Sequence, residues 1–184
     1  SEMCIRDSLQ YRYVSYQAWG VNDNYVSEEV GMQPIDVDKQ YHFFNPRAGV
    51  SYTLAERNNF YLSFAVAQKE PTRSDFTDRY KFAADDTYPS SEKLYDWELG
   101  YQYTAPRLSL GVNLYYMKYK DQLVPTGMVN DDSNALNTNV PDSYRRGVEL
   151  SASWRATGWF TVGANATFSQ NRIENYVDAL KDSP

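Results

Sequence analysis

Few residues in this chain have side chains suited to catalysis or metal binding. His42 is the only histidine and Cys4 the only cysteine, so a His-based catalytic triad or a zinc site has too few members. The sequence contains no Gly-x-Ser-x-Gly, P-loop or His-Glu-x-x-His motif. Two acidic pairs, Asp85-Asp86 and Asp131-Asp132, carry the oxygen ligands that Ca²⁺ prefers, but their spacing fits no known calcium loop. The sequence therefore predicts neither an enzyme nor a bound cofactor or metal.

Charged residues, together with two tyrosines near them, are the remaining candidates for chemistry, and they fall into two groups. One group lies in segments where apolar and polar residues alternate, and it consists of Arg47, Glu98, Glu149 and Arg155. The other lies within the polar stretch 70–92 and consists of Arg73, Arg79, Tyr80, Lys81 and Tyr88. Cations beside aromatic rings can bind an anionic ligand, although the same residues also suit an ordinary solvated loop. What either group can do depends on the elements that carry it.

The dominant sequence period is two, which is typical of β-strands. In Asn59–Lys69, every second residue from Phe60 to Val66 is apolar, and the residues between them are Tyr61 and small side chains. The same template fits seven segments, which we predict to be strands: Leu9–Trp19, Tyr41–Leu54, Asn59–Lys69, Lys93–Thr104, Arg107–Tyr119, Tyr144–Arg155 and Trp159–Arg172. No segment has the period of an amphipathic helix.

Strand length and loop order favour a membrane barrel over a soluble sandwich. The predicted strands are roughly twice the ~5–6 residues of a mean soluble strand, and a tilted membrane strand needs ~9–11 residues. Three connections are short, near residues 56–58, 105–106 and 156–158, and three are long and polar, at Gly20–Gln40, Glu70–Glu92 and Lys120–Ser143. Short and long connections alternate, as in a barrel with turns at one rim and extracellular loops at the other. We therefore expect an all-β fold, a fragment of an antiparallel up-and-down transmembrane β-barrel with about seven long strands.

The composition agrees with this fold and argues against other classes. The 184 residues carry a net charge of −6, which disfavours a nucleic-acid binder. No apolar run reaches the ~18–20 residues of a membrane-spanning helix. Aromatic residues make up 16% of the chain, more than soluble domains usually carry. Several aromatic residues on the apolar face of the predicted strands lie beside the short turns, where the aromatic girdle of a membrane interface would lie: Tyr52, Phe60, Tyr103, Trp154 and Phe160.

The two ends of the sequence look cut rather than finished. Residues 1–8 lack the features of a signal peptide and look like a translated sequencing adaptor, so we exclude them from the expected domain, residues 9–184. Asp178 to Pro184 form a polar stretch without a closing element.

Five segments carry short motifs in a fixed order. They are residues 43–52 with Pro-Arg-x-Gly-x-x-Tyr, 65–76 (AVAQKEPTRSDF), 91–101 (SEKLYDWELGY), 114–123 (LYYMKYKDQL) and 139–150 (NVPDSYRRGVEL). Together they resemble the barrel of TonB-dependent outer-membrane receptors of the siderophore-receptor type, and the last two are most similar to receptors from Bacteroidota. The resemblance covers nearly everything from Leu9 to about Tyr176.

The resemblance implies partners that the residues alone do not show. The family's receptors carry a plug domain with a TonB box before the barrel, and neither that domain nor the family's terminal strand is seen here. Such barrels have about 22 strands, so seven would be about a third of one wall. Barrel-wall glutamates of the family meet plug arginines, which suggests plug contacts for the charges of one parity: Arg47, Glu98, Glu149 and Arg155. Ordinary hydrated lumenal charges are the alternative.

The expected function is therefore a share in active uptake of a scarce ligand across the outer membrane of a Gram-negative bacterium. The resemblance favours a ferric siderophore, while vitamin B12 and oligosaccharides stay open. The 70–92 residues named above would meet the ligand at the outer mouth. Outer-membrane lipid, the plug and the TonB complex are the expected partners, and nucleic acid is not. Two alternatives remain: a passive porin-like channel without TonB coupling, and a secreted, aromatic-rich, glycan-binding β-sandwich.

Overall fold

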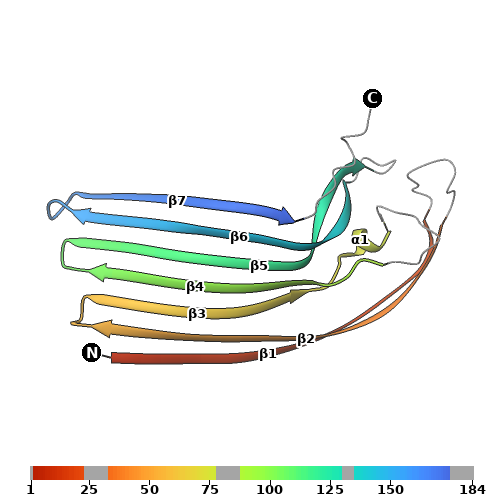
Figure 1. Ribbon diagram of the computed structural model, residues 1–184, viewed down its shortest axis with the longest axis horizontal. Helices are drawn as coiled ribbons and strands as arrows, with labels where there is room; N and C mark the ends of the chain where they lie inside the picture. Colours follow the sequence, from red (N-terminus) through yellow and green to blue (C-terminus); the bar gives the residue numbers. More distant parts are fainter. Residues whose placement is uncertain (1, 23–32, 78–87, 130–134, 175–184) are drawn as a thin grey trace.

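The computed structural model describes residues 2–22, 33–77, 88–129 and 135–174, which form one antiparallel sheet. The seven strands lie side by side in chain order, with β1 and β7 at the two edges (Figure 1). The strands are β1 (Glu2–Asn22), β2 (Gln33–Leu54), β3 (Asn58–Lys69), β4 (Glu92–Thr104), β5 (Leu108–Val129), β6 (Ala135–Arg155) and β7 (Thr161–Glu174). The predicted up-and-down, all-β fold is confirmed.

One face of the sheet carries an apolar row that crosses six strands. Register pairs the following residues directly, one from each of β2 to β7: Val50, Leu62, Leu99, Leu114, Val148 and Phe168. Of these, Leu62 is 52% exposed, Leu99 50% and Phe168 66%. No second layer covers this face in the described part of the chain. We call it the outer face.

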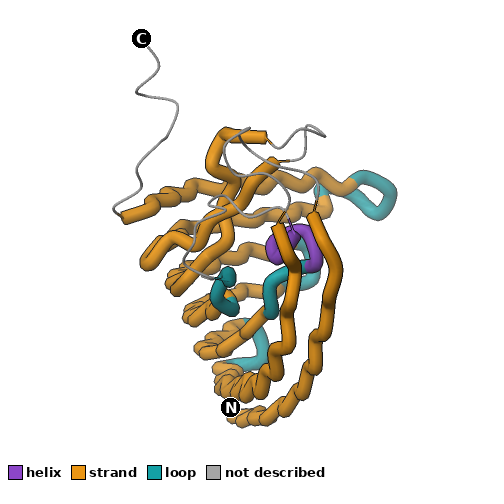
Figure 2. Tube along the Cα trace, turned by 90° about the vertical axis from the view of Figure 1, so that its right-hand side faces the viewer, coloured by secondary structure: helices purple, strands orange, loops and turns teal. Residues whose placement is uncertain are grey.

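The opposite face carries mostly small and polar side chains. The row next to the apolar one contains Gly49, Ser63, Glu98, Tyr115, Gly147 and Ser169. Successive residues of a strand point to opposite faces, so the alternation seen in the sequence directly separates the two surfaces. We call this face the inner face. The tube view in Figure 2 shows the sheet curving, with the short helix lying among the strands at one end.

The apolar band on the outer face runs diagonally across the strands. On β7 the band ends at Phe168, which is followed on the same face by Gln170. On β2 the residue in the row of Phe168 is Val50, and the band continues beyond it to Phe44. The edge of the band therefore shifts by six residues over the five strand steps from β7 to β2, which is about 20 Å along the strands for about 24 Å across them. The strands are therefore tilted by about 40° from the normal to the band, within the ~35–45° range of strand tilts in transmembrane barrels.

The short turns lie where the sequence predicted them, at one end of the sheet. Leu54 pairs with Asn58 across the β2–β3 turn. Backbone hydrogen bonds between Ala105 and Leu108 close the β4–β5 turn in both directions, at N–O distances of 2.7 and 3.3 Å.

The long connections are shorter than predicted because four strands extend into them. β2 begins at Gln33 rather than Tyr41, and β5 and β6 reach Val129 and Ala135, well inside the expected loop Lys120–Ser143. The β1–β2 and β5–β6 hairpins therefore run past β3, β4 and β7 and bend (Figure 1). The predicted bounds of these two connections, Gly20–Gln40 and Lys120–Ser143, are therefore too wide.

A proline explains why the β5–β6 hairpin was misread. Pro141 interrupts the pattern of β6 and has no N–H for the ladder. Asp121 lies opposite it with a φ of 53°, and the Asn139 side-chain amide donates to the Asp121 carbonyl at 2.5 Å. The Asn139 side chain thus donates a hydrogen bond to the Asp121 carbonyl close to Pro141, which has no N–H of its own to donate. The two strands continue to pair beyond this point.

β1 also extends in the other direction, since it includes residues 2–8. Glu2 to Ser8 pair with Thr53 to Arg47 of β2. That residues 1–8 are an adaptor remains a prediction, because pairing at an edge strand needs only backbone groups.

Buried apolar side chains gather at the long-loop end of the sheet. Val37 is 2% exposed, Phe43 2%, Phe76 1% and Val140 4%. Phe76 belongs to α1 (Arg73–Thr77), a five-residue helix that follows β3. In the described residues, no helix is long and apolar enough to cross a membrane.

Candidate functional site

The inner face brings three carboxylates together in the middle of the sheet. Asp96 and Glu98 project from the same side of β4, and Glu149 projects from β6. Glu98 pairs with Tyr115 of β5, and Asn113, the next inner residue on β5, pairs with Glu149. The side-chain amide of Asn113 donates to Glu149 Oε2 at 3.4 Å. Two strand steps separate the carboxylates of β4 and β6, or about 10 Å.

Two arginines flank these carboxylates on the inner face. Register places Arg47 opposite Ala65, which in turn lies opposite Asp96. Arg145 lies in the same row on the other side of Asp96, opposite Met117. The row therefore alternates in charge, with cations about 10 Å on either side of Asp96. No side-chain ion pair joins these residues in the described part of the chain.

Glycines let tyrosine rings lie flat on this wall. The ring of Tyr61 covers Gly100, where a Cβ atom would overlap ring carbons. The ring of Tyr115 covers Gly147, where a Cβ atom would lie 2.5 Å from the Tyr115 hydroxyl oxygen. Each pair is a directly opposed cross-strand pair. A side chain at either glycine would push a ring away from the sheet. The glycines therefore determine how closely the tyrosine rings around the carboxylates lie against the backbone.

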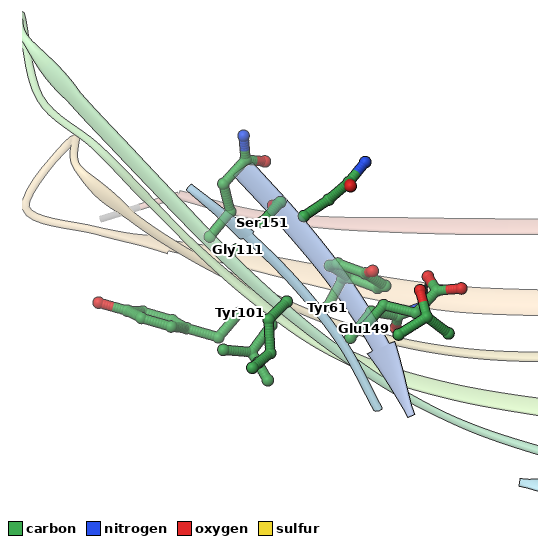
Figure 3. A pocket seen from close by; sticks show the side chains of 11 residues that line it. Tyr61, Tyr101, Gly111, Glu149 and Ser151 are labelled. Carbon is green, nitrogen blue, oxygen red and sulfur yellow. Dashed lines mark hydrogen bonds between the residues drawn. The ribbon is translucent and has the colours of Figure 1, made fainter. Parts of the chain in front are cut away.

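The carboxylate of Glu149 borders a hollow on the inner face. The hollow measures about 450 Å³, and its inner-face lining includes Tyr61, Asn113, Glu149, Ser151 and Thr167. Figure 3 shows Tyr61 and Glu149 on one side of the strands and Tyr101 on the other. The side chains that line it on the inner face are hydroxyl, amide and carboxylate groups, so it suits a polar or cationic partner.

Arg155 is not part of this group. It pairs with Thr161 at the start of β7, beside the short turn, and is exposed. Six residues along β6 separate it from Glu149, or about 20 Å. The structure thus brings Arg47, Glu98 and Glu149 to one region and leaves Arg155 at the rim.

The loop after β3 folds inward at the opposite end of the sheet. Glu70, at its start, forms a bidentate ion pair with Arg12 of β1. Asp75 of α1 accepts hydrogen bonds from the Thr72 backbone N–H at 2.7 Å and from the Asn137 side chain of β6 at 2.8 Å. The base of the loop is therefore tied to both sides of the curved sheet.

Aromatic stacking completes the anchoring of this loop. Phe76 stacks on Tyr16 of β1 with ring centroids 4.8 Å apart, and Tyr88 contacts Phe76 at 5.9 Å. The Tyr88 hydroxyl donates to the Asp36 carbonyl of β2 at 2.9 Å. The ammonium group of Lys39 lies 5.6 Å from the Tyr88 ring centroid, a cation–π contact.

The predicted ligand residues of segment 70–92 divide into three cases. Tyr88 takes part in the anchored cluster, and Arg73 lies exposed in the first turn of α1. Arg79, Tyr80 and Lys81 lie outside the described residues, as do both acidic pairs considered for calcium. Among the described residues, no group of three or more His, Cys, Asp or Glu side chains could hold a metal ion.

Sequence reasoning missed several residues of both regions. Asp96 lies two residues before Glu98 and Arg145 four residues before Glu149, so continuing the alternation along each strand is enough to find them. Arg12, Lys39 and Asp75 carried no such signal, because their partners are more than 30 residues away along the chain.

A comparison with protein families identifies the chain. The model described as "TonB dependent receptor-like, beta-barrel" matches residues 8–183. The chain belongs to this receptor family. The TonB-dependent receptors are transporters and receptors, so the prediction that the chain is not an enzyme is confirmed. A search of curated protein sequences gives no match.

Several solved structures share the fold of this chain. The copper transporter OprC matches with a TM-score of 0.76 and 18% identity, over 94% of this chain and 27% of OprC. The FrpB iron transporter from Neisseria meningitidis (F3-3 variant) matches with 0.65 and 19%, over 94% and 24%. The ferric-catecholate import receptor Fiu from E. coli K12 matches with 0.61 and 18%, over 94% and 26%. The chain thus spans about a quarter of the length of each, which agrees with a barrel fragment.

Proposed function

We propose that this chain is part of the barrel wall of a transporter in the outer membrane of a Gram-negative bacterium. The observation that carries the proposal is the exposed apolar row from Val50 to Phe168, backed by a polar row on the other face. Lipid on one side and a hydrated lumen on the other require this pattern. A glycan-binding sandwich would bury the row against a second sheet. The strand tilt of about 40° supports the same reading.

The proposed transport is active, with outer-membrane lipid, a plug domain and the TonB complex as partners. Family membership supports the plug and TonB. The inner-face carboxylates Asp96, Glu98 and Glu149 support it further, because arginines of a plug inside the lumen would complement them. In this proposal the wall holds the plug until energy from the inner membrane, transmitted through TonB, releases it.

The proposed ligand is a metal chelate, with a ferric siderophore favoured. Two of the similar structures are named for iron or ferric-catecholate transport and one for copper. Tyr88 of the anchored loop lies against Lys39 of β2 at the long-loop end of the sheet, and Arg73 is exposed on α1. Cations and aromatic rings together suit the anionic surface of an iron chelate.

Uptake by the full-length receptor tests the proposal. We expect cells that lack their own siderophore receptors, but produce this one, to accumulate ⁵⁵Fe from a ferric siderophore only when TonB is present. Equal accumulation without TonB would favour a passive channel. Uptake of copper, vitamin B12 or an oligosaccharide without iron uptake would contradict the siderophore while leaving active transport standing.

A further inference from the structure

A basic patch lies on the outer face, directly above the apolar band. It consists of Lys118 on β5, Arg146 on β6 and Arg172 on β7, grouped around Tyr144. All four point to the same side as Leu114, Val148 and Phe168, since they share the parity of those residues. The patch is therefore separate from the inner-face charges and from the anchored loop.

Register gives the patch its dimensions. Lys118 pairs with Tyr144, and Tyr144 pairs with Arg172, so the two cations lie on either side of one tyrosine, about 10 Å apart. Arg146 is two residues from Tyr144 along β6, or about 7 Å nearer the apolar band. Its guanidinium carbon lies 5.6 Å from the Tyr144 ring centroid.

The patch keeps most of its positive charge. Arg146 donates through Nε and one terminal nitrogen to the neutral Gln170 side chain, at 2.9 and 2.7 Å. These bonds fix the guanidinium but leave its charge and other N–H donors available. Lys118 forms an ion pair with Asp142 at 3.3 Å.

The row beyond the patch is balanced in charge. Lys93, Lys120, Asp142 and Glu174 lie opposite one another there, with two cations and two acids. Excess positive charge on this side of the sheet is therefore concentrated next to the apolar band.

A groove connects the patch with the band. It measures about 530 Å³, and its outer-face lining is Tyr116, Arg146, Val148, Phe168 and Gln170. Apolar side chains occupy its lower part and the guanidinium its upper end. A molecule with a hydrocarbon chain and a phosphate group matches both parts, because arginine binds phosphate through paired hydrogen bonds.

We propose that this patch binds the phosphate groups of a lipid in the leaflet on the long-loop side of the barrel. The proposal rests on the proposed membrane location of the outer face. Lipid is the occupant because the cations lie at the edge of the apolar band, at the depth of headgroups. Tyr116 and Tyr144 add amphipathic rings at the same depth.

Lipid retention by the full-length receptor tests this proposal. The probe is lipid A with both phosphates, compared with lipid A without phosphates, each mixed into detergent micelles and measured by native mass spectrometry. We expect the wild-type receptor to retain the phosphorylated form preferentially. Joint replacement Lys118→Gln, Arg146→Gln and Arg172→Gln should lower that retention at least about tenfold.

Arg145→Gln is the matched control. Arg145 is adjacent to Arg146 but projects from the inner face, where its Nε donates to Asn171 at 2.9 Å. Its loss should leave lipid retention unchanged. If the triple variant fails to fold, as judged by heat-dependent mobility in gels, the single variants Arg146→Gln and Arg172→Gln replace it, each with a partial loss of retention.

Three results would overturn the proposal. They are retention by the triple variant equal to wild type, an equal loss in Arg145→Gln, and no preference of wild type for phosphorylated lipid. The siderophore uptake assay described above is independent of these measurements. A receptor that retains phosphorylated lipid but transports nothing would therefore contradict the proposed transport and not the patch.

Discussion

At the scale of single residues, two glycines determine how close the lumenal surface lies to the sheet. Gly100 and Gly147 each accept a tyrosine ring from the opposite strand. The rings shield backbone that the glycines leave bare, and they lie near Glu98 and Glu149. Small residues on the polar parity therefore contribute to the site itself, beyond their role in strand alternation.

Adding one carbon at Gly100 should disturb this arrangement. Gly100→Ala places a Cβ atom inside the Tyr61 ring, and we expect a loss of about 1–3 kcal/mol in the free energy of unfolding. Urea titration of the full-length receptor in detergent, followed by gel mobility, measures it. Tyr61→Ala in the same protein should restore part of the loss. Gly158→Ala is the control, since no atom lies within 4 Å of its Cβ position. Equal effects of the two glycine replacements would contradict this explanation.

The inner-face carboxylates lead to a second prediction, on plug release. Glu98→Ala with Glu149→Ala removes two negative charges that are proposed to hold plug arginines. Because loss of one side of a charged contact costs about 2–5 kcal/mol, we expect a clear change in siderophore uptake rate with normal barrel assembly. Glu174→Ala, an acid on the outer face, is the control. Unchanged uptake in the double variant would mean that these are ordinary hydrated charges.

At the scale of elements, the sequence predicted the alternating faces of the strands better than their ends. In β3, β4 and β7 apolar and polar residues alternate strictly, so the sequence shows both that these segments are strands and which residues share a face. The sequence predicts loops at the long-loop ends of β2, β5 and β6, because the prolines and charges there normally end strands. Contacts such as Asn139 with the Asp121 carbonyl keep those hairpins paired, and such contacts have no local sequence signature.

α1 illustrates the same limit and leads to a third prediction. Phe76 holds the inward-folded loop through rings far away in sequence, and Phe76→Ala should release it at a cost of about 3–5 kcal/mol of local packing. We expect faster protease cleavage within residues 70–92 on intact cells that display the receptor. Ser74→Ala, an exposed change in the same helix, should leave the cleavage rate as in wild type. Equal rates for the two variants would show that the ring contacts do not hold the loop.

At the scale of the whole molecule, the chain is a wall without a closed interior. Its buried apolar residues lie at the long-loop end, while the middle of the outer face is exposed. β1 and β7 each present an unpaired edge in this sheet, and unpaired edges favour association. A continuous exposed apolar band of this kind is stable only against lipid, detergent or another apolar surface. In the proposed barrel, lipid covers that face and strands of the same barrel pair with both edges.

The isolated 184-residue chain should therefore aggregate in water and transport nothing. Exposed leucine, phenylalanine and tryptophan side chains along the outer face, together with two open edges, drive self-association faster than folding. Size-exclusion chromatography of refolded protein, with and without dodecylmaltoside, measures this directly. We expect large aggregates without detergent and smaller particles with it. Replacing Leu62, Leu99 and Leu114 by serine should lower aggregation, because these leucines form the centre of the apolar row. A detergent-free monomer from the unaltered chain would instead require the row to be buried, which is the arrangement of a soluble sandwich.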